Sequence, residues 1–375
     1  MKPIIKEIKG RKALKEFVLF PEELYKDDPW WVPSLISDEI NTLLPEKNPA
    51  FDYCEAAYFL AYNTEGKIVG RVAAMINHKA NEAWNEKSVR FGWIDFIEDQ
   101  DVVDALVGAV EKWGKEKGME KCKGPLGFTD MDKEGLLVEG FERLVPFTTI
   151  YNYPYYGPML EAAGYSKDVD WTQRIFDLPE ELPRMYKLVD ALAERAECHI
   201  FVPKNKKELR EEALKLFNDC YNSAFSVLYE FAPLTDKQVK AYVDQYIPVL
   251  NMDFIAIIHD RNERIVGFAV AVPSLSKAFQ KSRGRLFPTG LFHILHALNH
   301  EKTVEALMIG IVPEYQKKGL QVLLFHHLHM NGLKHGIKRM IMNPQLENNI
   351  KVQMLFDDFN PKPYMRRRSY IKEIK

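Results

Sequence analysis

A short basic turn between an apolar run and an amphipathic helix carries the clearest chemical signal in the sequence. The apolar run covers 304–312 and stops at Pro313. After the turn, apolar side chains recur at the spacing of one helix face, at Leu320, Leu323, Leu324 and Leu328. The first N–H groups of a helix lack intrahelical partners and carry partial positive charge, so they can bind phosphate. We therefore predict a phosphate site at the residues of this turn, which are Gln316, Lys317, Lys318, Gly319, Leu320 and Gln321.

The turn differs from the two best-known phosphate loops. It lacks the Gly-Lys-Ser/Thr ending of a Walker loop, and it is not a Gly-x-Gly-x-x-Gly dinucleotide turn. The local pattern also fits an ordinary strand–helix crossover with a solvated basic turn. That alternative stays open at the level of the motif.

Length and composition are those of a globular protein with two domains. At 375 residues the chain is too long for one average core. Its formal charge of −2 argues against a nucleic-acid partner, and because no uncharged run approaches ~18 residues we expect no membrane span. The first residues lack the apolar core of a signal peptide, and the four cysteines form no Cys-x-x-Cys pair. We therefore expect a cytoplasmic protein with reduced thiols.

An internal repeat defines the elements that must position the turn. Lys67-Ile-Val-Gly70 aligns without gaps to Arg264-Ile-Val-Gly267, and the strand–helix unit at 92–118 falls on 307–336. A repeat of this length indicates two copies of one domain rather than a solenoid. Each copy starts antiparallel and then switches to a strand–helix–strand crossover, so we predict an α+β fold with a mixed, mostly antiparallel sheet flanked by helices. The predicted domains are 1–178 and 179–375.

The order of elements, with a phosphate turn after the fourth strand, resembles the GCN5-related N-acetyltransferase (GNAT) superfamily in two tandem domains. The family motif Gln/Arg-x-x-Gly-x-Gly/Ala is matched at Gln316 and Gly319 and departs at Gln321. The resemblance implies that the turn holds the pyrophosphate of acetyl-CoA or another acyl-CoA. It also implies that the backbone of Ile311 and Val312 pairs with the pantetheine amides.

The second family signature, an Asn followed by Tyr-x-x-x-Gly-Phe, is only partly present. Glu347-Asn-Asn349 supplies candidate asparagines, of which we take Asn349, whereas Phe356 stands near the tyrosine position and Asp358-Phe359 replaces the Gly-Phe turn. By the resemblance, Tyr364 (or Tyr315) would replace the missing acid and Glu347 would act as the base. A solvated glutamate at a helix start is the other reading of Glu347.

In the first copy the phosphate turn aligns to Glu98-Asp-Gln-Asp101, whose three carboxylates repel a pyrophosphate. We therefore expect the N-terminal domain to be degenerate and the C-terminal domain to bind the cofactor. We also expect Gly319→Glu to abolish CoA binding and to leave the fold intact.

The predicted function is acyl-CoA-dependent N-acyl transfer to a small-molecule or peptide amine by direct attack on the thioester. Two rival functions remain: a non-catalytic acyl-CoA sensor, and an aminoacyl-tRNA-dependent transferase of the tandem-domain type. The histidines at 326–335 lack His-Glu-x-x-His spacing, so we expect no metal. The basic segment 277–285 and the helix after it fit a lid or a solvated charged face equally well. Arg366-Arg-Arg368 could bind phosphate, but such a run more often protects an edge strand.

Overall fold

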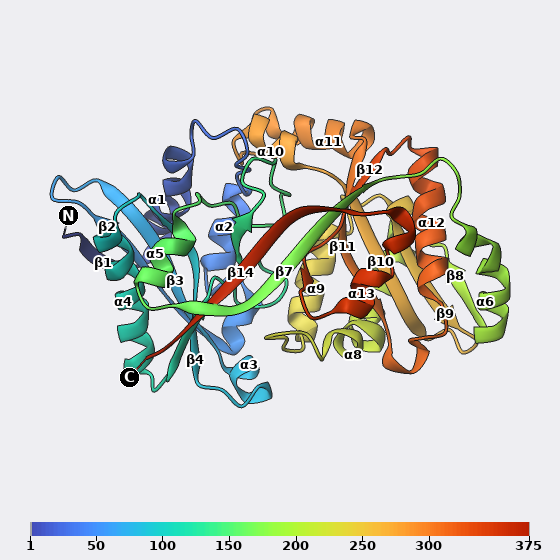
Figure 1. Ribbon diagram of the computed structural model, residues 1–375, viewed down its shortest axis with the longest axis horizontal. Coiled ribbons are helices and arrows are strands. Elements are labelled where there is room, and N and C mark those ends of the chain that lie inside the picture. Colours follow the sequence, from blue (N-terminus) through green and yellow to red (C-terminus); the bar gives the residue numbers. More distant parts are fainter. Residues whose placement is uncertain (1, 375) are drawn as a thin grey trace. The chain divides into compact units, whose positions relative to one another are not determined.

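The computed structural model describes residues 2–374 and divides into two compact units (Figure 1). Unit 1 comprises Met1–Thr172, Leu275–Ile294 and Met365–Lys375, and unit 2 comprises Gln173–Ser274 and Leu295–Tyr364. Within the described residues no helix is both long enough and apolar enough to cross a bilayer. The domain boundary after residue 178 stays a prediction.

Unit 1 is a mixed sheet in which a single parallel pair interrupts antiparallel pairing. Its strands, in sheet order, are β1 (Ile4–Ile8), β2 (Cys54–Tyr62), β3 (Ile68–Asn77), β4 (Ser88–Phe96), β5 (Lys121–Gly124) and the later residues of β14 (Lys362–Glu373). Only β4 and β5 are parallel among these neighbours, and β6 (Leu136–Glu139) pairs with β14. The helices of this unit are α1 (Gly10–Leu24), α2 (Ile36–Leu43), α3 (His78–Ala83), α4 (Gln100–Glu116), α5 (Tyr156–Ala162) and α10 (Ser276–Ser282).

Unit 2 repeats the same pairing pattern. Its strands, in sheet order, are β8 (Cys198–Phe201), β9 (Ile255–Asp260), β10 (Ile265–Pro273), β11 (Thr303–Ile311), β12 (Arg339–Ile341) and the last residues of β7 (Ser166–Asp177), with β13 (Gln345–Leu346) pairing beside β7. Here β11 and β12 form the parallel pair. Its helices include α6 (Val189–Ala196), α7 (Lys206–Leu216), α8 (Asn222–Phe225), α9 (Asp236–Tyr246), α12 (Gln321–Lys334) and α13 (Ile350–Met354), and α11 (Gly290–His300) has residues in both units. The predicted α+β fold with two tandem domains is confirmed.

Each sheet is completed by a strand from the other half of the sequence. In unit 1 the partner of β5 is β14, at the C-terminal end of the chain, and Tyr370 lies opposite Gly124. In unit 2 the partner of β12 is β7, where Asp177 lies opposite Arg339. Each unit therefore needs both halves of the chain for its sheet.

Helices cover both faces of each sheet because side chains alternate along the strands. In unit 1, Leu60 packs with α1 and α2, whereas its neighbour Ala61 lies opposite Gly70. A Cβ on Gly70 would come within 2.8 Å of Leu106 of α4, so α4 covers the other face. In unit 2, Phe268 lies against Phe225 of α8, with ring centroids 6.1 Å apart. Ala271, on the opposite face of β10, joins the core formed with α12.

The three consecutive arginines do not protect an edge strand, and that prediction is wrong. Strand β14 lies between β5 and β7 in the sheet. Arg366 and Arg368 both donate to the buried carboxylate of Asp170, at 3.0 and 2.8 Å. Arg367 is itself fully buried and donates to Thr149 Oγ1 at 2.7 Å and to the carbonyl of Ile150. The arginines therefore anchor the C-terminal strand in unit 1.

A carboxyl group in the loop after β5 gives unit 1 a predicted pH response. Asp132 accepts the N–H groups of Phe128 and Thr129 at 2.8 and 3.1 Å. Burial nevertheless raises the pKa of Asp132 to about 6, with smaller contributions from Glu39 and Asp130. In the unfolded chain the group loses its proton near pH ~3.9, so its contribution to stability is full below that pH and declines as the pH rises towards 6.

The variant Asp132→Asn cannot ionise but keeps an acceptor for both N–H groups. We expect its stability, measured against the wild-type protein by urea unfolding, to improve between pH 4 and pH 7. Ionisable groups that the two proteins share contribute equally to both free energies of unfolding, so they cancel in this difference. An unchanged difference across that window would rule out the raised pKa.

Candidate active site

The predicted phosphate turn is built as a tight connection between β11 and α12. Val312 N–H donates to Val266 C=O at 3.0 Å, which holds the end of the strand on β10. One short turn of 3₁₀-helix follows at Pro313–Tyr315. Lys317 and Gly319 then take left-handed backbone angles, with φ of 65° and 82°, and α12 starts at Gln321. The backbone thus reverses so that the first N–H groups of α12 come directly after the basic residues.

Side-chain contacts pin this turn to the β9–β10 hairpin. The Tyr315 hydroxyl donates to Asp260 Oδ2 at 3.1 Å, and Arg264 pairs with Glu314 at 2.7 Å. Lys318 Nζ lies 3.9 Å from the centre of the Tyr315 ring. Burial raises the pKa of Tyr315, and the hydrogen bond to Asp260 adds to the rise. These contacts give Tyr315 a structural role and favour Tyr364 over it as a candidate acid.

The sequence suggested that Gly319 could be replaced without strain, but its backbone conformation and its surroundings disfavour a side chain. Its φ of +82° disfavours any L side chain, and a Cβ there would lie 2.9 Å from Leu192 Cδ2 of α6. Gly319→Glu therefore strains the turn, and the expectation that it abolishes CoA binding and leaves the fold intact stays a prediction.

Beside the turn, β11 and β12 separate. They pair only from Thr303 opposite Arg339 to Glu305 opposite Ile341, and β12 ends there while β11 continues to Ile311. The register between β10 and β11 also shifts just beyond this point. Such irregularities bend a strand and recur next to active sites. The divergence opens a wedge in the sheet on the α12 side.

An apolar pocket lies in this wedge. Its apolar lining is Phe176, Leu178, Ala269, Val270, Ala306, Met308, Ile309, Phe325, Leu328, Met340, Phe356 and Phe359. Three polar side chains, Tyr186, His329 and Asn343, complete it. Its cavity volume is about 30 Å³, on the order of the room that two water molecules need. Phe356, at the position of the family tyrosine, is buried and packs on Phe325 at 4.7 Å.

The polar groups of the pocket have defined hydrogen-bonding states. His329 Nε2 lies 2.8 Å from the Pro179 carbonyl, which can only accept, so Nδ1 accepts from the Tyr186 hydroxyl at 3.1 Å. Burial lowers the pKa of His329, so the ring stays neutral. The Asn343 Oδ1 atom is buried and accepts no hydrogen bond from the described residues. We missed Asn343 in the sequence, where its only signal was an asparagine closing an apolar strand before a proline.

The remaining predicted residues lie on the segment after β12, away in sequence from the turn. Glu347 is half-buried just after β13, and its carbonyl accepts from Gln353 Nε2 at 3.3 Å. Asn349 precedes α13, and its carbonyl accepts from Val352 N–H at 3.1 Å. Tyr364 is half-buried in β14. Their roles as base, cofactor ligand and acid stay predictions.

The equivalent place in unit 1 is filled by tyrosines. Phe96 lies opposite Gly70 as Ile311 lies opposite Gly267, so the two positions correspond. Tyr156 OH accepts the Phe96 N–H at 3.0 Å, and Tyr155 OH donates to the Phe96 carbonyl at 2.7 Å. Both backbone groups at the end of β4 are thus occupied by side chains of the same unit.

A buried hydrogen-bond network holds Tyr156 in this position. Tyr156 lies 2.7 Å from the Tyr25 hydroxyl, which donates to Asp95 Oδ1 at 2.7 Å. Arg71 closes the network by donating to Asp95 Oδ2 at 2.7 and 2.8 Å. In unit 2 the matching carbonyl, of Ile311, instead accepts from the side-chain amide of the exposed Gln316 at 3.0 Å.

This geometry was compared with known proteins. No protein-family profile matches the chain. A tandem GNAT protein from the clavulanic acid biosynthesis pathway superposes with a TM-score of 0.56 at 12% identity, covering 100% of this chain and 99% of that one. The fold is that of tandem GNAT proteins. A GCN5-related N-acetyltransferase from Sphaerobacter thermophilus has a TM-score of 0.53 at 11% identity, with coverage of 100% and 96%.

Two bacterial relatives are similar to this chain in sequence. Protein YghO of Escherichia coli K12 is 29% identical over 381 residues, covering 99% of this chain and 95% of its own. A bacterial ceramide synthase of Caulobacter vibrioides is 25% identical over 317 residues, covering 82% and 80%. The predicted resemblance is therefore confirmed at the level of the fold.

Proposed function

We propose that unit 2 transfers an acyl group from acyl-CoA to an amine, and that unit 1 does not bind the cofactor. The observation that carries this proposal is the difference between two equivalent positions. At Phe96 in unit 1 both backbone groups are held by tyrosine hydroxyls. At Ile311 in unit 2 the carbonyl accepts from the side-chain amide of the exposed Gln316, which a ligand amide can replace, and β12 no longer pairs with β11 at this level.

In this proposal the cofactor extends the edge of β11. The pantetheine amides pair with the backbone of Ile311 and Val312 in the manner of an added strand. The pyrophosphate lies on the turn from Gln316 to Gln321, where Lys317 and Lys318 add positive charge to the start of α12. Gln321 has a larger side chain than the small residue of the family motif, but its backbone N–H still belongs to the first turn of α12.

The reaction is attack of an amine nitrogen on the thioester carbonyl. A C–N bond forms, the C–S bond breaks, the nitrogen loses a proton and the thiolate gains one. Phe356 has no hydroxyl to supply that proton, so we assign the acid to Tyr364 and the base to Glu347, with Asn349 helping to hold the cofactor. Asn343 adds a buried acceptor at the pocket for the attacking amine.

The acyl group and the acceptor are proposed to be long-chain. The pocket beside the thioester position is lined almost wholly by apolar side chains. One of the two relatives in sequence is a bacterial ceramide synthase, and a ceramide is by definition a fatty amide of a long-chain amino alcohol. With Phe356 and Phe359 in place the pocket has little free volume, so a long chain requires this segment to move aside.

The predicted lid segment also carries exposed apolar side chains. The segment predicted as a lid belongs largely to unit 1, where Arg285 pairs with Glu22 at 2.9 Å and Ser276 donates to Val145 C=O at 3.0 Å. It presents exposed apolar side chains at Phe287 and Phe292, 75% and 70% exposed. Exposed aromatic groups of this kind mark binding surfaces for apolar partners.

Thermal unfolding with CoA, acetyl-CoA and a long-chain acyl-CoA, followed by transfer assays, tests the proposal. A ligand that binds only the folded state raises the melting temperature, so we expect a shift with all three and turnover with a long-chain amine. A shift without turnover on short- and long-chain amines would favour the acyl-CoA sensor. No shift with any CoA compound would remove the proposal and leave the aminoacyl-tRNA-dependent transferase as the rival to test.

A further inference from the structure

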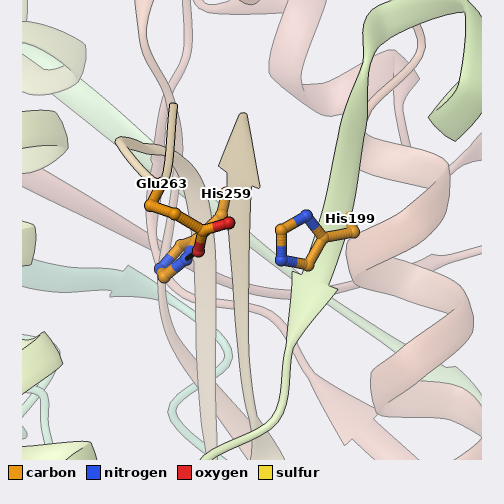
Figure 2. Close-up of side chains that lie close together, drawn as sticks. All are labelled: His199, His259 and Glu263. Atoms are coloured by element: carbon orange, nitrogen blue, oxygen red, sulfur yellow. Dashed lines mark hydrogen bonds and ion pairs between the residues drawn. The ribbon is translucent and has the colours of Figure 1, made fainter. Parts of the chain in front are cut away.

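Two histidines and a glutamate meet on unit 2 at the outer end of its sheet. His199 of β8 and His259 of β9 are direct cross-strand neighbours, and Glu263 follows in the turn between β9 and β10. Figure 2 shows the Glu263 carboxylate beside the His259 ring and the His199 ring turned towards them. The three ligand atoms lie within 4.8 Å of one another. Imidazole and carboxylate are the ligands of many three-residue zinc sites.

The distances suit a tetrahedral ion after a small adjustment. Bonds of about 2.0–2.1 Å to a tetrahedral zinc ion place neighbouring ligand atoms about 3.4 Å apart. His259 Nδ1 and Glu263 Oε2 are 3.1 Å apart, close to that spacing. The side chains of His199 and Glu263 are exposed, so rotation about their own torsions can bring the third ligand in.

A buried carboxylate lies behind the His259 ring and can hold the ring in the orientation and tautomer that metal binding requires. Glu212 Oε2 lies 3.1 Å from His259 Nε2, and Lys215 holds the other oxygen of Glu212 at 2.7 Å. If the Nε2 proton is directed at Glu212, Nδ1, which lies 3.1 Å from Glu263 Oε2, is the ring atom that can bind an ion in place of a proton. Phe201 stacks on the ring at 4.7 Å and prevents it from turning. A carboxylate behind a ligating histidine is the usual support of such sites.

We propose that His199, His259 and Glu263 bind a divalent transition-metal ion of the zinc class, with water in the fourth position. The ion ties the outer strand β8 to the β9–β10 turn. The same turn contributes Asp260, which holds Tyr315, and Arg264, which holds Glu314. The metal therefore supports the hairpin on which the turn before α12 rests, and the proposal does not depend on acyl transfer.

Titration of the metal-free full-length protein with Co²⁺, followed by visible absorption, and with Zn²⁺, followed by calorimetry, tests this site. We expect one ion per chain and the intense visible bands of tetrahedral Co²⁺. Because His259 is buried, the test uses the exposed ligands: His199→Ala and Glu263→Gln should each weaken binding at least about tenfold. Glu212→Gln, which changes only the positioning of His259, should cost about 10–100-fold.

A matched control removes a different pair of histidines. His296 and His300 stack one turn apart on α11, with ring centroids 4.3 Å apart, and such a pair can bind metal weakly. The double variant H296A/H300A should keep the Co²⁺ spectrum and the affinity. No binding to the wild-type protein, binding lost in H296A/H300A, or binding unchanged in both His199→Ala and Glu263→Gln would each overturn the proposal.

Discussion

Gln321→Glu should lower CoA affinity at least about tenfold, or ~1.4 kcal/mol, without destabilising the protein. The residue opens α12, where a negative charge interacts favourably with the helix dipole and adds about 0.3–1 kcal/mol. The same charge repels the pyrophosphate that the helix start is proposed to hold. Binding and stability should therefore move in opposite directions, which a folding defect cannot imitate. Calorimetric titration with CoA and thermal unfolding without ligand measure the two effects.

Unit 1 offers a matched control for this substitution. Gln100 is the first residue of α4, the helix equivalent to α12. Its amide donates to Asp104 at 2.8 Å and to the Met159 carbonyl at 3.0 Å, so Gln100→Glu should cost some stability. Because unit 1 is proposed not to bind the cofactor, that variant should keep its CoA affinity. Unchanged affinity in Gln321→Glu would remove the turn from the site, whereas a loss in Gln100→Glu would reassign binding to unit 1.

Asp95→Asn should destabilise the protein by about 3–5 kcal/mol, the range measured when one partner of a buried ion pair is removed. Asp95 and Arg71 are both more than nine-tenths buried, and their closest approach is 2.7 Å. The amide still accepts from Tyr25, but Arg71 loses the charge that compensates its own burial. Urea unfolding followed by circular dichroism measures the change.

Two further variants identify the cause of that loss. Asp104→Asn removes a carboxylate from the exposed face of α4 and should change stability by no more than about 0.5 kcal/mol. Adding Arg71→Met to Asp95→Asn should recover part of the loss because the uncompensated charge is gone. A small effect of Asp95→Asn, or no recovery in the double variant, would show that the Asp95–Arg71 pair does not stabilise the network that holds Tyr156 in unit 1.

Much of the architecture followed from local sequence patterns. The strand, turn and helix around Gly319 were readable because apolar periodicity and a glycine with positive φ are local properties. The repeat of Ile-Val-Gly at 70 and 267 located two hairpins, since a glycine lying close to another element constrains each copy in the same way. The acidic residues at 98–101 predicted where the two copies differ in charge, and the loss of cofactor binding in unit 1 stays a prediction.

Contacts between distant residues could not be read in this way. No local pattern indicated that the hydroxyls of Tyr155 and Tyr156 bond to the backbone of Phe96, because the three residues meet only after α5 packs beside β4. The residues at 199 and 259 that we propose as metal ligands also showed no signal in the sequence, since cross-strand pairing rather than spacing brings them together.

The sequence by itself determined the two-copy α+β fold and the position of the basic turn, because both depend on periodicity and on residues that are neighbours in the chain. Only the tertiary structure decided which half of the chain completes each sheet, and at which strand end tyrosine hydroxyls bond to the backbone. Arg366 to Arg368 illustrate the reason: a charged run reads as exposed until a buried partner such as Asp170 is brought to it from almost 200 residues away. Burial of that kind is a property of the assembled sheet.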